Sequence, residues 1–276
     1  MSLRSKRDYP ELDKLSVRLA RRKYFSVSYP KSGRTWLRFM VDDYRTRLFG
    51  IRVPQVFAVE KKLRWRHRIV WTHAGGDFRH PYYGQLTFRD RLDRGAPYLF
   101  LTRNFHGILN SAFHHRTYRR NKMQLPPSNF IRHPNCGILH VVSYYNMWLE
   151  LRREIPSFKV FAYEDLKKDP FATMSGVIEA LELPLREDLL RQTVECGSVA
   201  NMKALANSEA YAGTVLAPSD RGDERSAKVR EGSTSGYRAL FSDEDLAYIG
   251  QVISNHFLGL DDPDFARCAE RIDLKS

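Results

Sequence analysis

Four short runs of β-forming residues alternate with longer helical patterns, and this alternation is the feature that most constrains the fold of the chain. The β-like runs are Tyr24–Tyr29, Arg68–His73, Tyr98–Arg103 and Phe158–Ala162. The helical patterns that follow are Arg34–Phe49, Phe105–Tyr118, Asn135–Glu154 and Phe171–Leu183. Strands that alternate with helices predict an α/β fold, in which helices flank a central parallel sheet.

The rest of the chain is mostly helical beyond Pro184. A polar stretch, Asn207–Leu240, predicts a long loop, and a last helix is expected from Ser242 to about Phe257 with Ser242 as its cap. The length of 276 residues suits one large domain or two small ones, and 42% hydrophobic residues can build a substantial core.

The stretch YFSVSYPKSGRTWLRF, residues Tyr24–Phe39, predicts a strand, a tight turn and the start of a helix. A proline ends the strand, and Gly33 permits a turn whose backbone N–H groups stay exposed. Such a corner directs free amides and the positive end of a helix dipole at one point, which is an anion site. Lys31 adds a full charge, and Ser32 and Thr35 add hydroxyl donors.

This corner differs from a Walker A loop, because its lysine precedes the glycine and the loop is shorter. The order Tyr-Pro-Lys-Ser-Gly-x-Thr-Trp-Leu resembles the 5′-phosphosulfate-binding loop of the sulfotransferase family, whose donor is 3′-phosphoadenosine 5′-phosphosulfate (PAPS). The resemblance implies that the donor is bound by Lys31, Ser32, Gly33, Arg34, Thr35 and Trp36. In this reading the lysine stabilises the leaving phosphate, the loop amides hold the 5′-phosphate, and the tryptophan stacks on adenine. Arg34 stands where the family usually has threonine, and either adds charge or faces solvent.

A second stretch, LFLTRNFHGILNSAFHHR, resembles the family's 3′-phosphate signature, an arginine followed by a serine in the next helix. The match is carried by Arg103 at the end of a predicted strand and by Ser111, about two helical turns further on. Arginine suits this role because its planar fork matches phosphate oxygens.

Three further segments resemble the family less closely. In VFAYEDLKKDP, Tyr163 would lie near the adenine, and in GSVANMK, Ser198 would contact the nucleoside. KVREGSTSGYRALFS matches in part the family segment that closes over the 3′-phosphate, through Arg230 and Gly232. Glu231 replaces a lysine there and would repel a phosphate, so we expect it to face outward.

The stretch RIVWTHAGG resembles the context of the family's general base. By this resemblance His73 would take the proton from an acceptor hydroxyl as that hydroxyl attacks sulfur, and histidine titrates close to neutral pH. Trp71 replaces the lysine usual in the family, which leaves the local electrostatics open. His114 and His115 also lie near the donor motif.

The resemblance covers about residues 24–257 and implies one sulfotransferase domain over 1–276, of the cytosolic or bacterial type. It would transfer a sulfuryl group from PAPS, without a metal, to a hydroxyl or amine of a small-molecule acceptor. Three alternative functions stay open: a nucleotide kinase with an aberrant phosphate loop, a basic nucleic-acid-binding protein, and a non-catalytic relative that binds the donor. The net charge of +13 permits nucleic-acid binding, but no recognition signature matches.

The cysteine pattern and the hydropathy favour a cytoplasmic protein. Three separated cysteines form neither a disulfide framework nor a metal motif, and the charged start lacks the apolar core of a signal peptide. No run approaches the roughly 20 apolar residues needed to span a membrane. We therefore expect no membrane span, no metal and no nucleic-acid partner, while the acceptor and the oligomeric state stay open.

Overall fold

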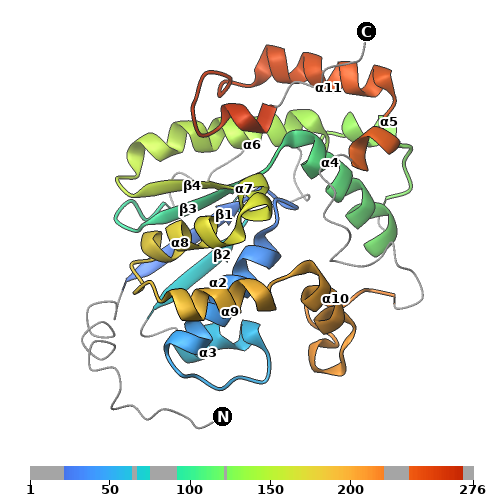
Figure 1. Ribbon diagram of the computed structural model, residues 1–276. Helices are drawn as coiled ribbons and strands as arrows, with labels where there is room; N and C mark the ends of the chain where they lie inside the picture. The colour runs from blue at the N-terminus through green and yellow to red at the C-terminus, as the bar shows by residue number, and fades with distance from the viewer. Residues whose placement is uncertain (1–21, 64–66, 75–91, 121–122, 221–235, 270–276) are drawn as a thin grey trace.

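The computed structural model describes residues 22–63, 67–74, 92–120, 123–220 and 236–269. A central sheet of four parallel strands, in the order β2-β1-β3-β4, runs through this part of the chain (Figure 1). The strands are β1 Lys23–Ser28, β2 Arg68–Thr72, β3 Tyr98–Thr102 and β4 Phe158–Ala162. The predicted α/β fold with a parallel sheet flanked by helices is confirmed, and the four predicted strands are the observed ones to within a residue at each end.

Helices cover both faces of the sheet. Their bounds are α2 Arg34–Leu48, α3 Val59–Leu63, α4 Phe105–His114, α5 Pro127–Ile131, α6 Ile138–Leu151, α7 Tyr163–Lys168, α8 Pro170–Ala180, α9 Glu187–Cys196, α10 Val199–Asn207 and α11 Asp243–His256. Shorter turns are η2 Val56–Ala58, η5 Arg152–Glu154, η6 Glu209–Tyr211, η8 Gly236–Ala239, η9 Ala266–Ala269 and the π-helical turn η4 His115–Arg119. None of the described helices is long and apolar enough to cross a membrane.

Alternation along β1 divides the core between the two faces of the sheet. Phe25, Val27 and Tyr29 belong to the core on the side of α4, α6 and α11, whereas Tyr24 belongs to the core on the side of α2, α8 and α9. Successive side chains of a strand face opposite sides, so one strand supplies both hydrophobic layers. The carboxyl ends of all four strands meet at one edge, where open α/β sheets bind their ligands.

Several helix bounds differ from the sequence-based expectation for local reasons. Ser242 caps α11 as predicted, accepting a hydrogen bond from the Asp245 backbone N–H at 3.2 Å. The helix expected at Phe171–Leu183 begins at Pro170, because Asp169 caps it by accepting from the N–H of Ala172 at 2.9 Å. The short helices α3, α5 and α7 and the turn η2 were not predicted.

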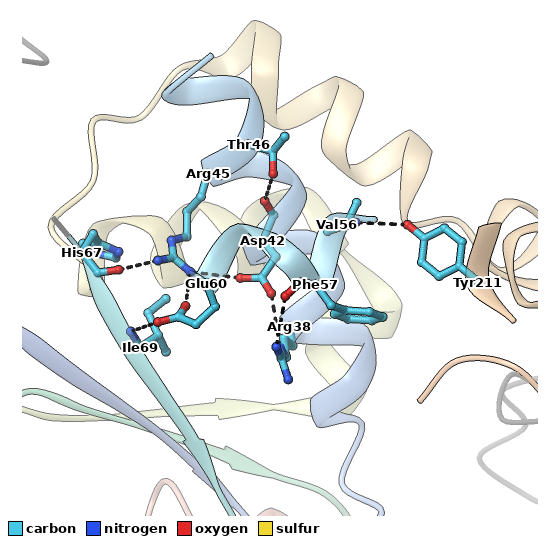
Figure 2. Close-up of polar contacts among 10 residues, drawn as sticks. All are labelled: Arg38, Asp42, Arg45, Thr46, Val56, Phe57, Glu60, His67, Ile69 and Tyr211. Atoms are coloured by element: carbon cyan, nitrogen blue, oxygen red, sulfur yellow. Dashed lines mark hydrogen bonds and ion pairs between the residues drawn. The ribbon is translucent and has the colours of Figure 1, made fainter. Parts of the chain in front are cut away.

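A buried ionic network fixes α2 against α3 and β2 (Figure 2). The fully buried Arg45 donates to Asp42 at 3.0 Å, to Glu60 at 2.7 Å and to the backbone carbonyl of His67. Glu60 also accepts from the backbone N–H of Ile69 at 3.1 Å. Burial raises the pKa of Asp42 to about 6, although Arg45 opposes that change. The network therefore sets the position of α2, which follows the Lys31 loop, relative to β2, the strand directly before His73.

Candidate active site

The loop between β1 and α2 has the geometry of an anion site. Lys31 and Gly33 both adopt positive φ angles, 77° and 96°. Gly33 is the N-cap residue of α2. No side chain of the described residues accepts a hydrogen bond at this end of the helix, and its first turn has no acidic residue. The helix therefore begins with backbone N–H groups that no side chain caps, and these are the groups that bind phosphate and sulfate in proteins. Ser32 is fully buried in this loop, and Thr35 is half-buried in the first turn.

Arg103 joins the second predicted phosphate motif to this loop. From the end of β3 its Nη1 donates to the carbonyl oxygen of Lys31 at 2.9 Å, and its guanidinium lies 4.3 Å from the ring centre of Tyr163. Its Nε is buried, and nothing in the described part of the chain accepts from it. Gly107 makes the arrangement possible, because a Cβ there would lie 2.8 Å from that Nε. A buried donor without a partner beside an anion site fits a phosphate ligand.

Ser111 lies in α4 and is half-buried, whereas Arg103 lies between the end of β3 and Asn104, the N-cap of that helix. The helix begins two residues after Arg103 and carries Ser111 about two turns further on. The role of this pair in binding the 3′-phosphate stays a prediction.

An aromatic corner adjoins the Lys31 loop on the side of α9 and α10. The rings of Trp36 and Tyr163 meet edge to face with centres 5.9 Å apart, and the Trp36 indole N–H donates to the carbonyl oxygen of Gly197 at 2.7 Å. The backbone of Gly33 packs closely against the ring of Tyr163, because a Cβ at Gly33 would lie 2.4 Å from that ring. This corner offers aromatic surface on which a base can stack.

The structure gives Ser198 a capping role next to this corner. Its hydroxyl accepts from the N–H of Asn201 at 3.3 Å and so begins α10. Sequence reasoning named Ser198 but missed the preceding Gly197, whose carbonyl orients Trp36. Gly197 also accommodates Met40, because a Cβ there would lie 2.6 Å from that side chain. The only sequence signal for Gly197 was its place as a glycine just before a helix.

His73 lies at the carboxyl edge of the sheet, directly after β2. Its Nδ1 bonds to the carbonyl oxygen of Ser28, at the end of β1, at 2.8 Å. A carbonyl can only accept, so the proton is on Nδ1 and Nε2 is the basic nitrogen. Trp71 lies on the same strand, and the guanidinium of Arg38 lies 6.0 Å from its ring centre. The predicted base is thus one strand away from the Lys31 loop and directly bonded to the strand that leads into it.

Arg34 follows Gly33 and is largely buried. Burial lowers the pKa of its guanidinium to about 10, with the nearby charge of Arg38 acting in the same direction and Tyr144 acting against it. The side chain therefore remains charged at neutral pH. Tyr144 of α6 acts on its charge, which places the guanidinium within electrostatic range of that helix.

Arg230, Glu231 and Gly232 lie outside the described residues. The chain after them is described again at η8, where the ring of Tyr237 lies 4.9 Å from that of His106 in the first turn of α4. Burial, aided by Arg238, lowers the pKa of His106 to about 4, so the imidazole is neutral. The segment that follows the predicted closing loop therefore packs on α4, the helix that carries Ser111 and begins two residues after Arg103.

Comparison with known proteins identifies the chain. A family model described as the sulfotransferase domain matches residues 87–261, which is more than half of the chain. The chain belongs to the sulfotransferase domain family. The predicted family and enzyme class, a sulfotransferase, are thereby confirmed. The match contains Arg103, Ser111 and Tyr163 and begins after the Lys31 loop and His73, so the expected domain extent of 1–276 stays a prediction.

Solved structures show the same fold at low sequence identity. Mouse sulfotransferase SULT7A1 complexed with PAP is 19% identical, with a TM-score of 0.61 over 94% of this chain and 92% of that chain. Retinol dehydratase with androsterone and inactive cofactor PAP is 16% identical, with a TM-score of 0.61 over 96% and 88%. Its complex with retinol and PAP is 18% identical, with a TM-score of 0.55 over 92% and 87%. Among curated proteins, none matches this chain.

Proposed function

We propose that this sulfotransferase transfers the sulfuryl group of PAPS to a hydroxyl or amine of a small-molecule acceptor. The observation that carries the proposal is the hydrogen bond of 2.8 Å between His73 Nδ1 and the carbonyl oxygen of Ser28. It holds a histidine with a basic Nε2 beside the strand that leads into the Lys31 loop. In our proposal this basic nitrogen is the general base, and it acts at the same edge of the sheet as the anion site, as an in-line group transfer requires.

The proposed step balances as follows for a hydroxyl acceptor. The acceptor oxygen forms a bond to sulfur while the bond between sulfur and the bridging oxygen of the donor breaks. The acceptor proton passes to Nε2 of His73. The electron pair of the broken bond stays on the 5′-phosphate, where Lys31 and the uncapped N–H groups of α2 stabilise the charge. The products are a sulfate ester and adenosine 3′,5′-bisphosphate (PAP).

The donor is supported by the neighbours and by the residues that converge here. Mouse SULT7A1 and retinol dehydratase are complexed with PAP, and retinol dehydratase also with androsterone or retinol. In our proposal Arg103 and Ser111 hold the 3′-phosphate, the corner of Trp36 and Tyr163 holds the adenine, and Ser198 contacts the nucleoside. Arg230, Glu231 and Gly232 keep their predicted place in the closing segment.

Turnover with PAPS and a panel of phenols, alcohols and amines tests the proposal, with release of PAP as the readout. His73→Ala and Lys31→Ala should each lower turnover by about 100-fold or more. His73→Ala should leave the affinity for PAP nearly unchanged, because His73 serves the acceptor. His256→Ala, which removes an exposed histidine at the end of α11, is the matched control. Unaltered turnover in both site variants would contradict the mechanism.

A further inference from the structure

Arg34 is a largely buried cation for which the described part of the chain supplies no counterion. The ionisable groups that act on its charge are the Tyr144 hydroxyl and the like charge of Arg38, and no carboxylate is among them. Arg34 also makes no hydrogen bond or ion pair with another described residue. An unpaired buried charge is costly, and proteins rarely keep one without a ligand or partner.

Three other arginines of this protein pair with carboxylates, whereas Arg34 pairs with none among the described residues. Arg45 is bonded to two carboxylates and a carbonyl, and Arg47 pairs with Asp43 at 2.6 Å. Arg152 pairs with Asp262. Among the described residues Arg34 shares its lack of a carboxylate partner with Arg103, the buried arginine beside the Lys31 loop, whose Nε has no acceptor. Donors left without a partner at a site of this kind fit an anionic ligand.

Two observations place Arg34 on the acceptor side of the loop. Tyr144 acts on its charge, and the ring of Tyr144 lies 5.2 Å from the ring of Tyr29, which follows Ser28, the hydrogen-bond partner of His73. Positions 34, 38 and 45 fall on one stripe of α2, given about 3.6 residues per turn. Figure 2 shows Arg38 and Arg45 of that stripe turned toward α3 and β2, the strand directly before His73. Trp36 lies on the opposite side of the helix, where its indole bonds to Gly197 in the nucleotide corner.

We propose that Arg34 binds an anionic group of the acceptor, a carboxylate, sulfate or phosphate, while the acceptor's hydroxyl or amine faces His73. The inference rests on the proposed function and names the class of its acceptor. The backbone N–H of Arg34 stays available to the donor phosphate in the first turn of α2. The planar fork of its guanidinium can bind two oxygens of one anionic group, which fixes the orientation of the acceptor as well as its charge.

Matched acceptor pairs test this inference on the protein saturated with PAP. The pairs are 3-(4-hydroxyphenyl)propionate with 4-ethylphenol, and 6-hydroxyhexanoate with hexan-1-ol, and binding is measured by calorimetry. Wild type should bind the anionic member of at least one pair about tenfold or more tightly, since charge-assisted hydrogen bonds are worth about 1.5–3 kcal/mol. Arg34→Gln should reduce that advantage to below about threefold, and Arg34→Lys should restore part of it.

Two controls separate the possible results. Arg191→Gln removes one exposed positive charge from α9 and should keep the anionic preference of wild type. The affinity for PAP should change less than about threefold in Arg34→Gln, because the guanidinium lies on the acceptor side.

Other results would overturn the inference. One is that wild type binds both members of every pair equally, or binds neither member. Another is that the preference for the anionic member survives in Arg34→Gln. A loss of PAP affinity in Arg34→Gln would also overturn it, because the guanidinium would then serve the donor. Failure of the wild-type protein to bind PAP would instead remove the proposed function, and this inference with it.

Discussion

Arg103 donates from Nη1 to the carbonyl oxygen of Lys31 across 2.9 Å, and this bond joins two loops that are 72 residues apart in sequence. It is possible because β1 and β3 are parallel neighbours, so that their carboxyl ends meet at one edge of the sheet. The bond also restrains Lys31, whose φ of 77° is uncommon for a residue with a side chain. Arg103 therefore supports the anion loop and places its own charge beside it.

Gly33→Ala tests the contact between the Lys31 loop and Tyr163. The added Cβ would lie 2.4 Å from the tyrosine ring at a φ of 96°, so the ring or the loop must move. We expect PAP affinity to fall by about tenfold or more, and the free energy of unfolding to fall by about 2–4 kcal/mol. Calorimetry with PAP and urea denaturation measure the two effects.

Gly50→Ala is the matched control for backbone strain. Gly50 has a φ of 60° but nothing within 4 Å of the added Cβ. This variant should lose about 1–2 kcal/mol of stability and keep its affinity for PAP. Equal loss of PAP affinity in both glycine variants would show that the contact with Tyr163 is unimportant.

Arg45→Met tests the buried network between α2, α3 and β2. The change leaves the carboxylates of Asp42 and Glu60 without their shared cation in a buried setting. We expect the free energy of unfolding to fall by about 3–5 kcal/mol, which urea denaturation would measure. Arg191→Met breaks an exposed ion pair with Glu187 and should cost less than about 1 kcal/mol. Similar losses in the two variants would contradict the account.

The buried His67 predicts a specific loss of stability in acid. Burial, aided by Arg45, lowers the pKa of His67 to about 3, so the unfolded chain binds its proton first as pH falls. The contribution of the neutral His67 to stability is fully present above the pKa of this histidine in the unfolded chain. It is lost as pH falls from about 6.5 toward 3. His67→Gln should therefore reduce the loss of unfolding free energy between pH 7 and 5 by about 2 kcal/mol.

Asp42 acts in the opposite direction over the same pH range. Its pKa of about 6 lies above the ordinary value, so the folded state binds this proton first and gains stability as pH falls. Comparison of wild type with His67→Gln largely cancels this contribution, because Asp42 is present in both. His256→Gln, at an exposed position, should show the pH dependence of wild type. The same pH dependence in His67→Gln would contradict the assignment.

The strands were predictable because each is a compact β-forming run bounded by turn residues. The prediction at Tyr24–Tyr29 became β1 at Lys23–Ser28, a shift of one residue. The short helices α3 and α7 were missed because so few residues carry no clear periodicity. Tertiary contacts define them instead, such as the ion pair that Asp165 of α7 forms with Arg267 at 2.6 Å.

The candidate site was predictable only where an ordered motif carries it. Lys31 and Arg103 were found in this way, and the structure brings them together. Gly197 and His106 were missed because their partners, Trp36 and Tyr237, lie far away in sequence. Whether Arg34 faces solvent or the interior was also open, since the answer depends on neighbours that are distant in sequence, such as Tyr144.

The most direct test of the central claim is calorimetric titration with PAP on wild type and Arg103→Ala. The account predicts saturable binding by wild type and a loss of about 30-fold or more in the variant, because a charge-assisted phosphate contact and the bond to Lys31 are both removed. Equal affinity in the two proteins would contradict the placement of the 3′-phosphate at Arg103. No binding to wild type would mean that the Lys31 loop holds a different anion.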